Sequence, residues 1–504
     1  MFAAGRRQAY AAASRQIRTV HSAAFSSQRR STAIVLLGLS GAVATYGVYA
    51  YNSSSPIDLK EARDQKFQLI SGVEADVQGP GVFAWGSNLG GVLAPTSKEE
   101  RVLSPRRLKF LDAVVLRDLA LREDVGVAVT ENGDLLQWGV GYSGLPRATI
   151  AEPEVTLKGK NVVQVSLSES HVFALSKGGK VYALPISKAE QQSGTKPSES
   201  AWWGLGLYSR PSDISYVTID AKLNSFEKFK SIAAGHAHLL LLTSSSRLLT
   251  VPMITAAPFT AVPLPNIPEL PITQIATGDL HSLALAADGS VYSWGHNELG
   301  QCGQDFAKNT TVVAEPTPVP LNLCYPRVAR IQCIAIAAGG HSSFYVVKNG
   351  EQKTDVFSSG FGQYGQLGNG SFSQSQYRPT KLKSISSLTE YSEAAGTSVP
   401  IGIKSLVCGL TAAGVVLDNA SVDGFGRDLL TWGTGATGNG KKNNVSTPAP
   451  VPTGEGKTAS EGSRLQLQPQ RKVSFEKDGK TRWVNVEDTI IAGRGVMAMY
   501  SRAV

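Results

Sequence analysis

Cysteine and histidine are scarce in this sequence. Its 504 residues include 4 cysteines and 7 histidines, and no two cysteines are spaced as Cys-x-x-Cys. Structural zinc sites and disulfide-rich secreted domains depend on paired or regularly spaced cysteines, so the sequence indicates neither. We expect buried free thiols at the four positions, which are Cys302, Cys324, Cys333 and Cys408.

The motifs that carry much enzyme chemistry are also missing. No segment matches a phosphate-binding loop, a nucleophile elbow or a helical metal motif. The glycine-rich residues 435–440 lack the Lys-Ser/Thr pair of a phosphate loop. Asp279 and Asp288 lie near His281 in the sequence, but ordinary turn chemistry explains both. We therefore predict that the protein is not an enzyme and that it has no cofactor and no metal.

Excess positive charge is confined mainly to the N-terminus. The net charge is +9, and residues 1–30 hold six arginines and no acid, which leaves +3 for the remaining 474 residues. Binding to a phosphate backbone needs a basic surface, so the sequence does not favour nucleic acid as a partner. A leader rich in Arg, Ser and Ala without acids is typical of a mitochondrial transit peptide. The alternative is a basic tail without function.

An apolar run follows this leader. Residues 33–51, bounded by Ala33 and Tyr51, number nineteen and carry no charge. A helix of that length spans roughly 28 Å, close to the thickness of the hydrocarbon core. We predict a transmembrane helix at 31–52 after the transit peptide at 1–30, with removal of the segment on import as the alternative. The preceding arginine pair favours a matrix-side N-terminus. A single-pass protein of the mitochondrial inner membrane would then expose its remainder to the intermembrane space.

The body of the chain repeats one pattern. Its clearest copy is residues 272–303, ITQIATGDLHSLALAADGSVYSWGHNELGQCG. Two isoleucines lead to a glycine turn, a strand from His281, an Asp288–Gly289 turn and a strand that ends in Trp294–Gly295. Asp-Gly between two apolar runs is a strong signal for a β-hairpin, because a type I′ turn needs positive φ at both central residues.

The same frame recurs with losses, so that six hairpins lie at residues 116–139, 162–185, 229–252, 272–303, 331–360 and 403–433. The shared positions are a histidine at the start of the first strand and a Trp-Gly pair at the end of the second, seen in Trp85, Gly86, Trp138, Gly139, His171, His238, His281, Trp294, Gly295, His341, Trp432 and Gly433. A strand-end Trp buries a large ring between neighbouring repeats, and the Gly permits the following turn. We expect the histidines to be hydrogen-bonded structural residues, because symmetry spreads them too far apart to share a metal.

A seventh hairpin is divided between the two ends of the body. Residues 489–500 supply a glycine turn and a first strand, and residues 81–86 supply a strand that ends in Trp-Gly. Pairing the two segments closes a ring without a bare sheet edge. The sequence thus predicts an all-β fold, a seven-bladed β-propeller at 76–504 closed by its N- and C-terminal strands. A linker at 53–75, with a short helix, joins it to the preceding transmembrane helix.

Three long segments between strands are candidate partner surfaces, because propellers bind through loops on one face. Residues 186–228 should finish the third blade after an insertion. Residues 253–271 carry five prolines, which argue against a second membrane helix. Residues 434–484 are polar and read as a loop. The sequence does not decide which of these segments binds a partner.

The repeats resemble those of the regulator of chromosome condensation repeat family. Residues 272–303 follow its pattern I-x-x-I-x-x-G-x-x-H-S-L-A-L-x-x-D-G-x-V-Y-x-W-G-x-N-x-x-G-Q-x-G almost throughout, and residues 356–370 and 82–91 match its second half. The leader, the apolar span and the propeller together resemble a fungal mitochondrial branch of this family that is implicated in biogenesis of respiratory complex III.

This resemblance implies a non-catalytic, membrane-anchored scaffold or assembly factor. Its partners would be proteins of the mitochondrial inner membrane, above all complex III subunits or assembly factors. The alternative is guanine-nucleotide exchange on a small GTPase, which is the activity of the family's nuclear founder. The leader and the anchor argue against that alternative.

Overall fold

The computed structural model describes residues 80–504, apart from residues 113, 150–151, 201–208, 253–258, 268, 305–310, 326–330, 351, 393–395, 420–426, 454–463 and 478–479. The transit peptide predicted at 1–30, the membrane span predicted at 31–52 and the linker predicted at 53–75 lie outside the described residues. Within the described part of the chain, no helix is both long and apolar enough to cross a bilayer.

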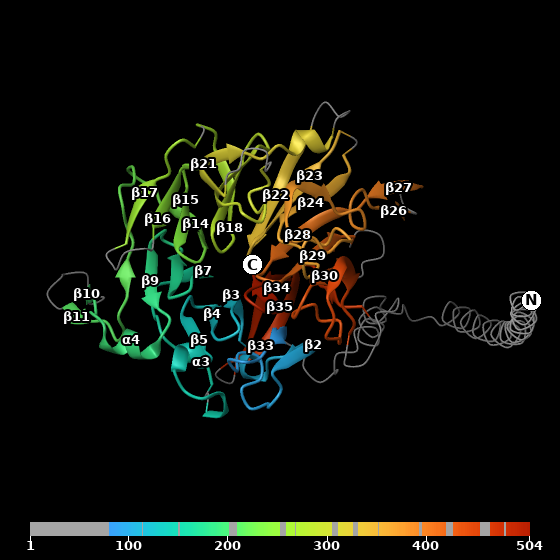
Figure 1. Cartoon of the computed structure of the whole chain (residues 1–504). Coiled ribbons are helices and arrows are strands. Elements are labelled where there is room, and N and C mark those ends of the chain that lie inside the picture. The colour runs from blue at the N-terminus through green and yellow to red at the C-terminus, as the bar shows by residue number, and fades with distance from the viewer. Residues whose placement is uncertain are drawn as a thin grey trace, which may run out of the picture. The chain divides into compact units, whose positions relative to one another are not determined.

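The described chain is all-β, and its small antiparallel sheets are arranged around a common centre (Figure 1). We call each group of successive antiparallel strands a unit and name it by its inner strand; the first such group also joins β35 (Val496–Ala503) through one parallel contact, Leu116 with Arg502. Six units run in chain order from the inner to the outer edge: β3 (Leu116–Leu121), β4 (Gly126–Thr130), β5 (Leu135–Trp138) and β6 (Glu154–Val155); β7 (Val162–Leu167), β8 (His171–Ser176), β9 (Val181–Pro185) and β12 (Val217–Thr218); β14 (Phe229–Ala234), β15 (His238–Thr243), β16 (Leu248–Pro252) and β17 (Thr260–Pro263); β18 (Ile272–Thr277), β19 (His281–Ala286), β20 (Val291–His296) and β21 (Val312–Pro318); β22 (Gln332–Gly339), β23 (Ser342–Lys348), β24 (Thr354–Gly360) and β25 (Gln376–Lys381); and β28 (Gly402–Cys408), β29 (Ala412–Asp418), β30 (Arg427–Gly433) and β31 (Val445–Pro450).

The alternation of leucine and alanine in the repeats has a direct structural cause. β19 is buried along its whole length, because both of its faces pack against a neighbouring unit. Leu283 and Leu285 belong to a core shared with the β22 unit, whereas Ala284 and Ala286 belong to a core shared with the β14 unit. A large residue on one face and a small one on the other let the sheets stack closely.

The split unit joins the two ends of the described chain. β1 (Val82–Ser87) pairs on one side with β35 (Val496–Ala503) and on the other side with β2 (Arg101–Arg107). β34 (Lys480–Ala492) forms its inner edge. Val82 lies opposite Tyr500, and Gly86 lies opposite Val496. The pairing predicted between the two terminal segments is therefore present, and β1 is not left as an edge.

Strand direction gives the assembly two different faces. The turns from the first to the second strand of each unit, such as 122–125 and 278–280, lie at the same end as the segments that follow the third strand. We call this end the long-loop face. The opposite end, which we call the hairpin face, carries the turns from the second to the third strand and the connections from one unit to the next.

The long segments contain more regular structure than predicted. The prediction of a loop over 434–484 is wrong, because this segment includes β31, β32 (Gln466–Leu467), β33 (Arg471–Lys477) and the start of β34. β33 and β34 form a hairpin around residues 478–479. Residues 186–228 contain α4 (Lys188–Ser193), β10 (Ser198–Ser200), β11 (Ser209–Pro211), β12 and β13 (Asp220–Ala221), and β12 completes its unit as predicted.

The remaining connections hold short elements. β17 lies within residues 253–271 and adds the fourth strand of the β14 unit, and β13 pairs with β17 in parallel on its outer side. A small hairpin of two strands, β26 (Thr389–Ser392) and β27 (Thr397–Pro400), precedes the β28 unit. The other helices of the described residues are one-turn segments: η1 (Lys109–Leu111), α3 (Val140–Ser143), η2 (Arg147–Thr149) and η4 (Leu321–Cys324).

Candidate functional site

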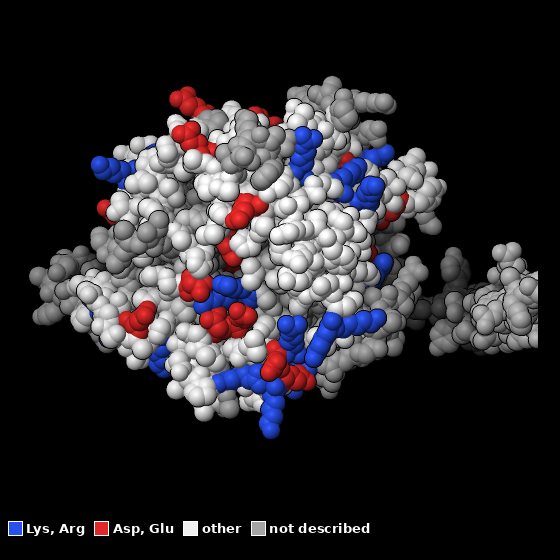
Figure 2. All heavy atoms as spheres, in the orientation of Figure 1, with Lys and Arg blue, Asp and Glu red and all other residues white. Residues whose placement is uncertain are grey.

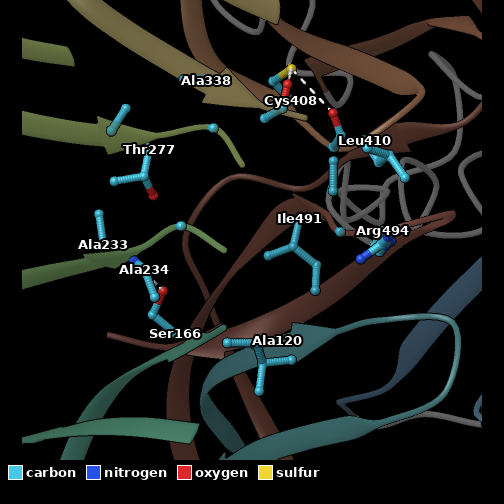
Figure 3. A pocket seen from close by; sticks show the side chains of 18 of the residues that line it. Ala120, Ser166, Ala233, Ala234, Thr277, Ala338, Cys408, Leu410, Ile491 and Arg494 are labelled. Atoms are coloured by element: carbon cyan, nitrogen blue, oxygen red, sulfur yellow. Dashed lines mark hydrogen bonds between the residues drawn. The ribbon is translucent and has the colours of Figure 1, made fainter. Parts of the chain in front are cut away.

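The inner strands surround a cavity of about 400 Å³. Its wall is built largely from backbone and small side chains, which Figure 3 shows pointing inward from several units; those labelled include Ala120, Ser166, Ala234, Thr277 and Ala338. Small residues recur here because every inner strand converges on the same narrow space. We call this cavity the channel; its wall is mostly small and apolar, and its charged lining residues lie at its mouth.

Polar side chains on the inner strands tie three pairs of neighbouring units together. The Gln164 Nε2 group donates to the Ile232 carbonyl oxygen, and its Oε1 accepts from the Ile232 N–H group, both at 3.1 Å. Gln274 makes the same pair of bonds with the β22 unit. The Asp118 carboxylate accepts from the Val165 N–H group at 2.8 Å, and burial raises the pKa of this acid to about 6. These wall residues are committed to structure.

Charged side chains meet at the channel mouth on the long-loop face. Glu169 lies at the centre of the group, with its Oε2 atom 3.0 Å from Arg494 Nη1, 3.5 Å from His236 Nδ1 and 3.9 Å from Arg122 Nη1. Asp279 lines the same opening. Figure 2 shows basic and acidic groups side by side near the middle of the face that it draws. We call Arg122, Glu169, His236, Asp279 and Arg494 the mouth cluster.

One cation of the mouth cluster, Arg122, is held in place by several hydrogen bonds. The Arg122 Nη1 group donates to the carbonyl oxygens of Ser168 and Glu169, both at 2.9 Å, and its Nε group donates to Asp124. Burial alone lowers the pKa of Arg122, but the hydrogen bond and charge of Asp124 outweigh it and raise that pKa. The same pair keeps the pKa of Asp124 below its usual value, against the effect of burial. Arg122 is thus a fixed charge.

The channel also holds one thiol. The thiol of Cys408 lines the channel, but burial raises its pKa well above the ordinary value, and its Sγ atom lies 3.4 Å from the Gly409 carbonyl oxygen. A protonated thiol is a poor nucleophile. Among the residues that the structure describes, no group of three His, Cys, Asp or Glu side chains is placed to hold a metal ion. Glu169 remains half exposed, so a partner's charged group can reach it.

The predicted tryptophans form contacts between units. The Trp85, Trp138 and Trp432 indole N–H groups each donate at 2.9 Å to a backbone oxygen of the glycine-rich loop in the preceding unit, namely those of Ala436, Val92 and Gln366. Trp294 is buried as well. The following glycines, Gly86, Gly139, Gly295 and Gly433, all have positive φ. A Cβ atom on Gly295 would lie 2.5 Å from the Leu280 carbonyl oxygen.

A serine replaces the tryptophan contact in the β22 unit. The Ser343 hydroxyl donates to the Gln301 carbonyl oxygen at 2.6 Å. Gln301 follows a glycine in its loop just as Gln366 does. The carbonyl oxygen at this loop position therefore accepts from an indole N–H group in one unit and from a hydroxyl group in another.

Two of the predicted histidines also bridge units. His238 Nε2 lies 2.8 Å from Ser282 Oγ, and His281 Nε2 lies 2.8 Å from Ser343 Oγ. Burial lowers the pKa of His238 to about 4 and that of His281 to about 3, so both rings are neutral near pH 7. His171 instead packs edge-on against Phe259 and contacts the hydroxyl of its neighbour Ser170.

The fourth histidine was aligned incorrectly. His281 lies opposite Gly295, but in the β22 unit it is Ser342 that lies opposite Gly360. His341 therefore stands one residue earlier than the others, and its Nδ1 atom is buried without a hydrogen-bond partner. The turn has the same length in both units, since Gly339 pairs with Ser342 as Gly278 bonds to His281, so His341 takes the position that Leu280 has in the β18 unit.

The sequence interpretation missed the mouth cluster. Glu169, His236, Asp279 and Arg494 occupy one position in the repeat, the second residue after the end of the inner strand, and Arg122 stands one residue before that position in its own unit. Aligning the units would have exposed the four residues that share this position. Hydrogen-bonded contacts between residues more than 300 positions apart cannot be found from local patterns.

Comparison with known families identifies the repeats. Two models of the regulator of chromosome condensation (RCC1) repeat match, one over residues 272–301 and the other over residues 288–346 and 355–397. These residues include the β18 unit, where the sequence pattern is clearest. The finding agrees with the resemblance seen in the sequence.

Three curated relatives extend the comparison. The mitochondrial RCC1 domain-containing protein RUG3 of Arabidopsis thaliana is 25% identical over 342 residues, which are 65% of this chain and 72% of that protein. The mitochondrial protein FMP25 of Saccharomyces cerevisiae is 23% identical over 364 residues, and the match spans 62% of this chain but only 58% of FMP25. The guanine nucleotide exchange factor SRM1 of the same yeast is 25% identical over 297 residues, 53% of this chain and 57% of SRM1.

A solved structure supports the architecture. Human WBSCR16 aligns with a TM-score of 0.55 over 84% of this chain and 99% of that chain, at 19% sequence identity. At such an identity the likeness establishes the fold alone, which is that of an RCC1-type β-propeller.

Proposed function

Because this chain carries RCC1 repeats in an all-β propeller, we propose that it is a non-catalytic scaffold that supports assembly of a respiratory complex in the mitochondrial inner membrane, complex III above all. The mouth cluster carries the proposal. It places two arginines and a shared carboxylate at the centre of the long-loop face, where a partner's charged side chain can exchange with Glu169.

Exposed side chains around the cluster extend this surface. Leu89, Leu280 and Tyr364 are all more than 40% exposed on loops and turns of the long-loop face. A charged centre with an apolar surround is suited to a specific protein partner, since charge gives selectivity and apolar contact gives affinity.

The remaining parts of the proposal concern architecture and location. We take the ring to have seven blades, one for each unit and with the split unit as the closing blade, and the propeller domain to begin at residue 76. Residues 1–30 would direct the chain to mitochondria, as befits the relatives RUG3 and FMP25, whose names include that location. Residues 31–52 would anchor it in the inner membrane, with the propeller in the intermembrane space.

The test is partner capture by the full chain. Tagged protein is purified from detergent-solubilised mitochondria, and respiratory complexes of a deletion strain are separated on blue-native gels. Glu169→Arg should abolish recovery of the partner, because it places a third cation beside Arg122 and Arg494. Glu298→Arg, also exposed on the long-loop face, is the matched control and should capture normally. Intact complex III in the deletion strain, with no respiratory-chain protein recovered, contradicts the proposal.

A second candidate function is guanine-nucleotide exchange on a small GTPase. The match to SRM1, whose name gives that activity, favours it. In this case a mitochondrial GTPase would occupy the long-loop face. Nucleotide release from purified mitochondrial GTPases, measured with and without the full chain, separates the two functions. Acceleration by the chain that is lost in Glu169→Arg would replace the scaffold with an exchange factor.

A further inference from the structure

The chain enters the propeller from the hairpin face. β35 runs from Val496 at the long-loop face to Ala503 at the hairpin face, and its partner β1 runs in the opposite direction. Val82 lies opposite Tyr500, so the start of β1 is at the hairpin face. The first strand of the described domain therefore begins at that face.

The two faces differ in their exposed charge. At the turns and connections of the hairpin face the exposed cations include Lys109, Lys158, Lys177, Lys222, Lys228 and Lys383. Among the described residues of those same turns and connections, the exposed carboxylates are Asp220, Glu269 and Asp288.

The balance is reversed at the long-loop face. Its loops expose Glu99, Glu100, Glu152, Glu169 and Glu190, which outnumber their exposed lysines among the described residues. The modest positive charge of the body is therefore concentrated on one side, the side from which the chain enters.

Large apolar side chains stand among these lysines. Phe226, Leu323 and Tyr391 lie on three separate connections of the hairpin face and are 102%, 68% and 63% exposed. Trp483 is 63% exposed on the β33–β34 hairpin, which extends past the end of β35 at Ala503. The Lys472 ammonium lies 5.7 Å from the centre of the Trp483 ring. Tryptophan and tyrosine side chains favour the boundary between lipid and water, and lysines favour anionic headgroups.

We propose that the hairpin face docks on the anionic lipid surface of the membrane that holds the chain. The proposal rests on the proposed membrane anchor and adds an orientation to it. The hairpin face lies against the headgroups, and the mouth cluster points away from the membrane toward its partner. Exposed apolar residues occur on both faces, so the charge difference and the point of chain entry decide which face meets the lipid.

Electrostatics gives the size of the effect. Each lysine near an anionic surface contributes about a fivefold gain in the docking equilibrium, and exposed aromatic side chains add to it by partitioning into the interface. Docking should therefore weaken in high salt, because the attraction is screened beyond about 10 Å at 0.1 M salt.

The experiment uses the full chain reconstituted into vesicles. Amide hydrogen exchange is compared between vesicles of phosphatidylcholine alone and vesicles that also contain one-fifth cardiolipin. We expect residues 222–228 and 471–486 to be protected several-fold on the anionic vesicles only, with the mouth turns 122–125 and 278–280 unchanged. Protection of the mouth turns instead, or equal exchange on both vesicles, overturns the proposal. Protection that requires an added acidic mitochondrial protein, and not lipid, also overturns it.

Variants assign the protection to the lysines and Trp483. The triple variant Lys177→Gln, Lys228→Gln and Lys383→Gln should weaken docking by about two orders of magnitude, from fivefold per lysine. The triple Lys98→Gln, Lys196→Gln and Lys441→Gln removes equal charge from the long-loop face and should dock normally. Trp483→Ala should reduce protection of residues 471–486 in the same assay, with Phe372→Ala as its exposed aromatic control on the opposite face. Equal behaviour of the two triples contradicts the proposal.

Carbonate extraction separates this proposal from the anchor. A chain that carbonate releases, but whose hairpin face is protected on anionic vesicles, would refute the anchor and retain the docking. A chain that resists carbonate, but shows no lipid-dependent protection, would retain the anchor and refute the docking.

Discussion

Two arcs of the ring join their units by different chemistry. In the tryptophan arc, which comprises the β28 unit, the split unit and the β3 unit, an indole N–H reaches the glycine-rich loop of the preceding unit. In the histidine arc, which comprises the β14, β18 and β22 units, an imidazole instead contacts a serine of the following unit. Both contacts are buried, but only the second can take up a proton between pH 7 and pH 3.

This difference shows that different residues meet the same hydrogen-bonding requirement at equivalent places in the repeats. A buried carbonyl oxygen needs a donor, and Trp432 supplies it to Gln366 whereas Ser343 supplies it to Gln301. The tryptophan arc combines this bond with a large apolar contact. The histidine arc relies on polar groups that must remain neutral. The first arc should therefore contribute more stability, and the second should respond to acid.

The largest expected effect is that of Trp85→Ala. Trp85 is fully buried, bonds to Ala436 across a unit boundary, and lies in the strand that closes the ring. Removing a buried tryptophan costs about 3–5 kcal/mol. We expect a large fall in the thermal midpoint of the detergent-solubilised chain, followed by circular dichroism. Trp483→Ala, which removes an exposed ring, should leave the midpoint unchanged. A similarly small shift of the thermal midpoint in both variants would contradict a larger contribution of the tryptophan arc to stability.

A smaller effect should distinguish the arcs by pH. The folded pKa of His281 lies near 3, below the usual value of about 6.5. The unfolded chain therefore binds a proton more readily than the folded chain between these values, so stability falls as pH drops below 6.5. Linkage gives about 2 kcal/mol of loss at pH 5. His281→Gln should remove this part of the pH dependence in denaturant titrations at pH 7 and pH 5.

The matched control for that titration comes from the other arc. Trp432→Phe keeps an aromatic ring and changes no titratable group, so its stability difference from the natural chain should be the same at both pH values. A pH dependence that His281→Gln leaves intact would mean that the histidine arc is not the acid-sensitive part.

The smallest effect isolates the contact of a loop glycine with a tryptophan. Gly438 has a φ of +70°, and a Cβ atom there would lie 2.9 Å from Trp85 Nε1. Gly144 has a φ of +69° with nothing within 4 Å. Both alanine variants carry the cost of a left-handed backbone, about 1 kcal/mol, but only Gly438→Ala also displaces the ring. We expect Gly438→Ala to be less stable than Gly144→Ala by roughly another 1–2 kcal/mol in denaturant titrations. Equal losses of stability in the two variants would show that the loop moves to accommodate the added Cβ atom.

Local pattern was enough to predict the hairpins and the closure of the split unit. The turn glycines, the Trp-Gly strand ends and the Leu/Ala alternation each reflect packing that every unit repeats. The β33–β34 hairpin was missed although Asp478–Gly479 stands between alternating residues such as Val473 and Phe475. The many charges of that segment obscured a standard turn signal.

The candidate site was harder to predict, because its members are single residues from different repeats. Glu169 and Arg494 meet only through closure of the ring. His341 was wrongly predicted to be equivalent to the other histidines. The structure places it one residue before the equivalent position, which Ser342 occupies. An alignment of the repeats shows which residues occupy equivalent positions around the ring. It does not show which of their side chains contact one another.

The split unit also sets the order of events when this protein is made. Among the described strands β1 is the first to be made, yet its partner β35 is the last. Contacts between such distant segments form slowly, because a long loop must close first. The ring therefore cannot close until β35 has been made, and a chain truncated before Val496 would leave the ring open.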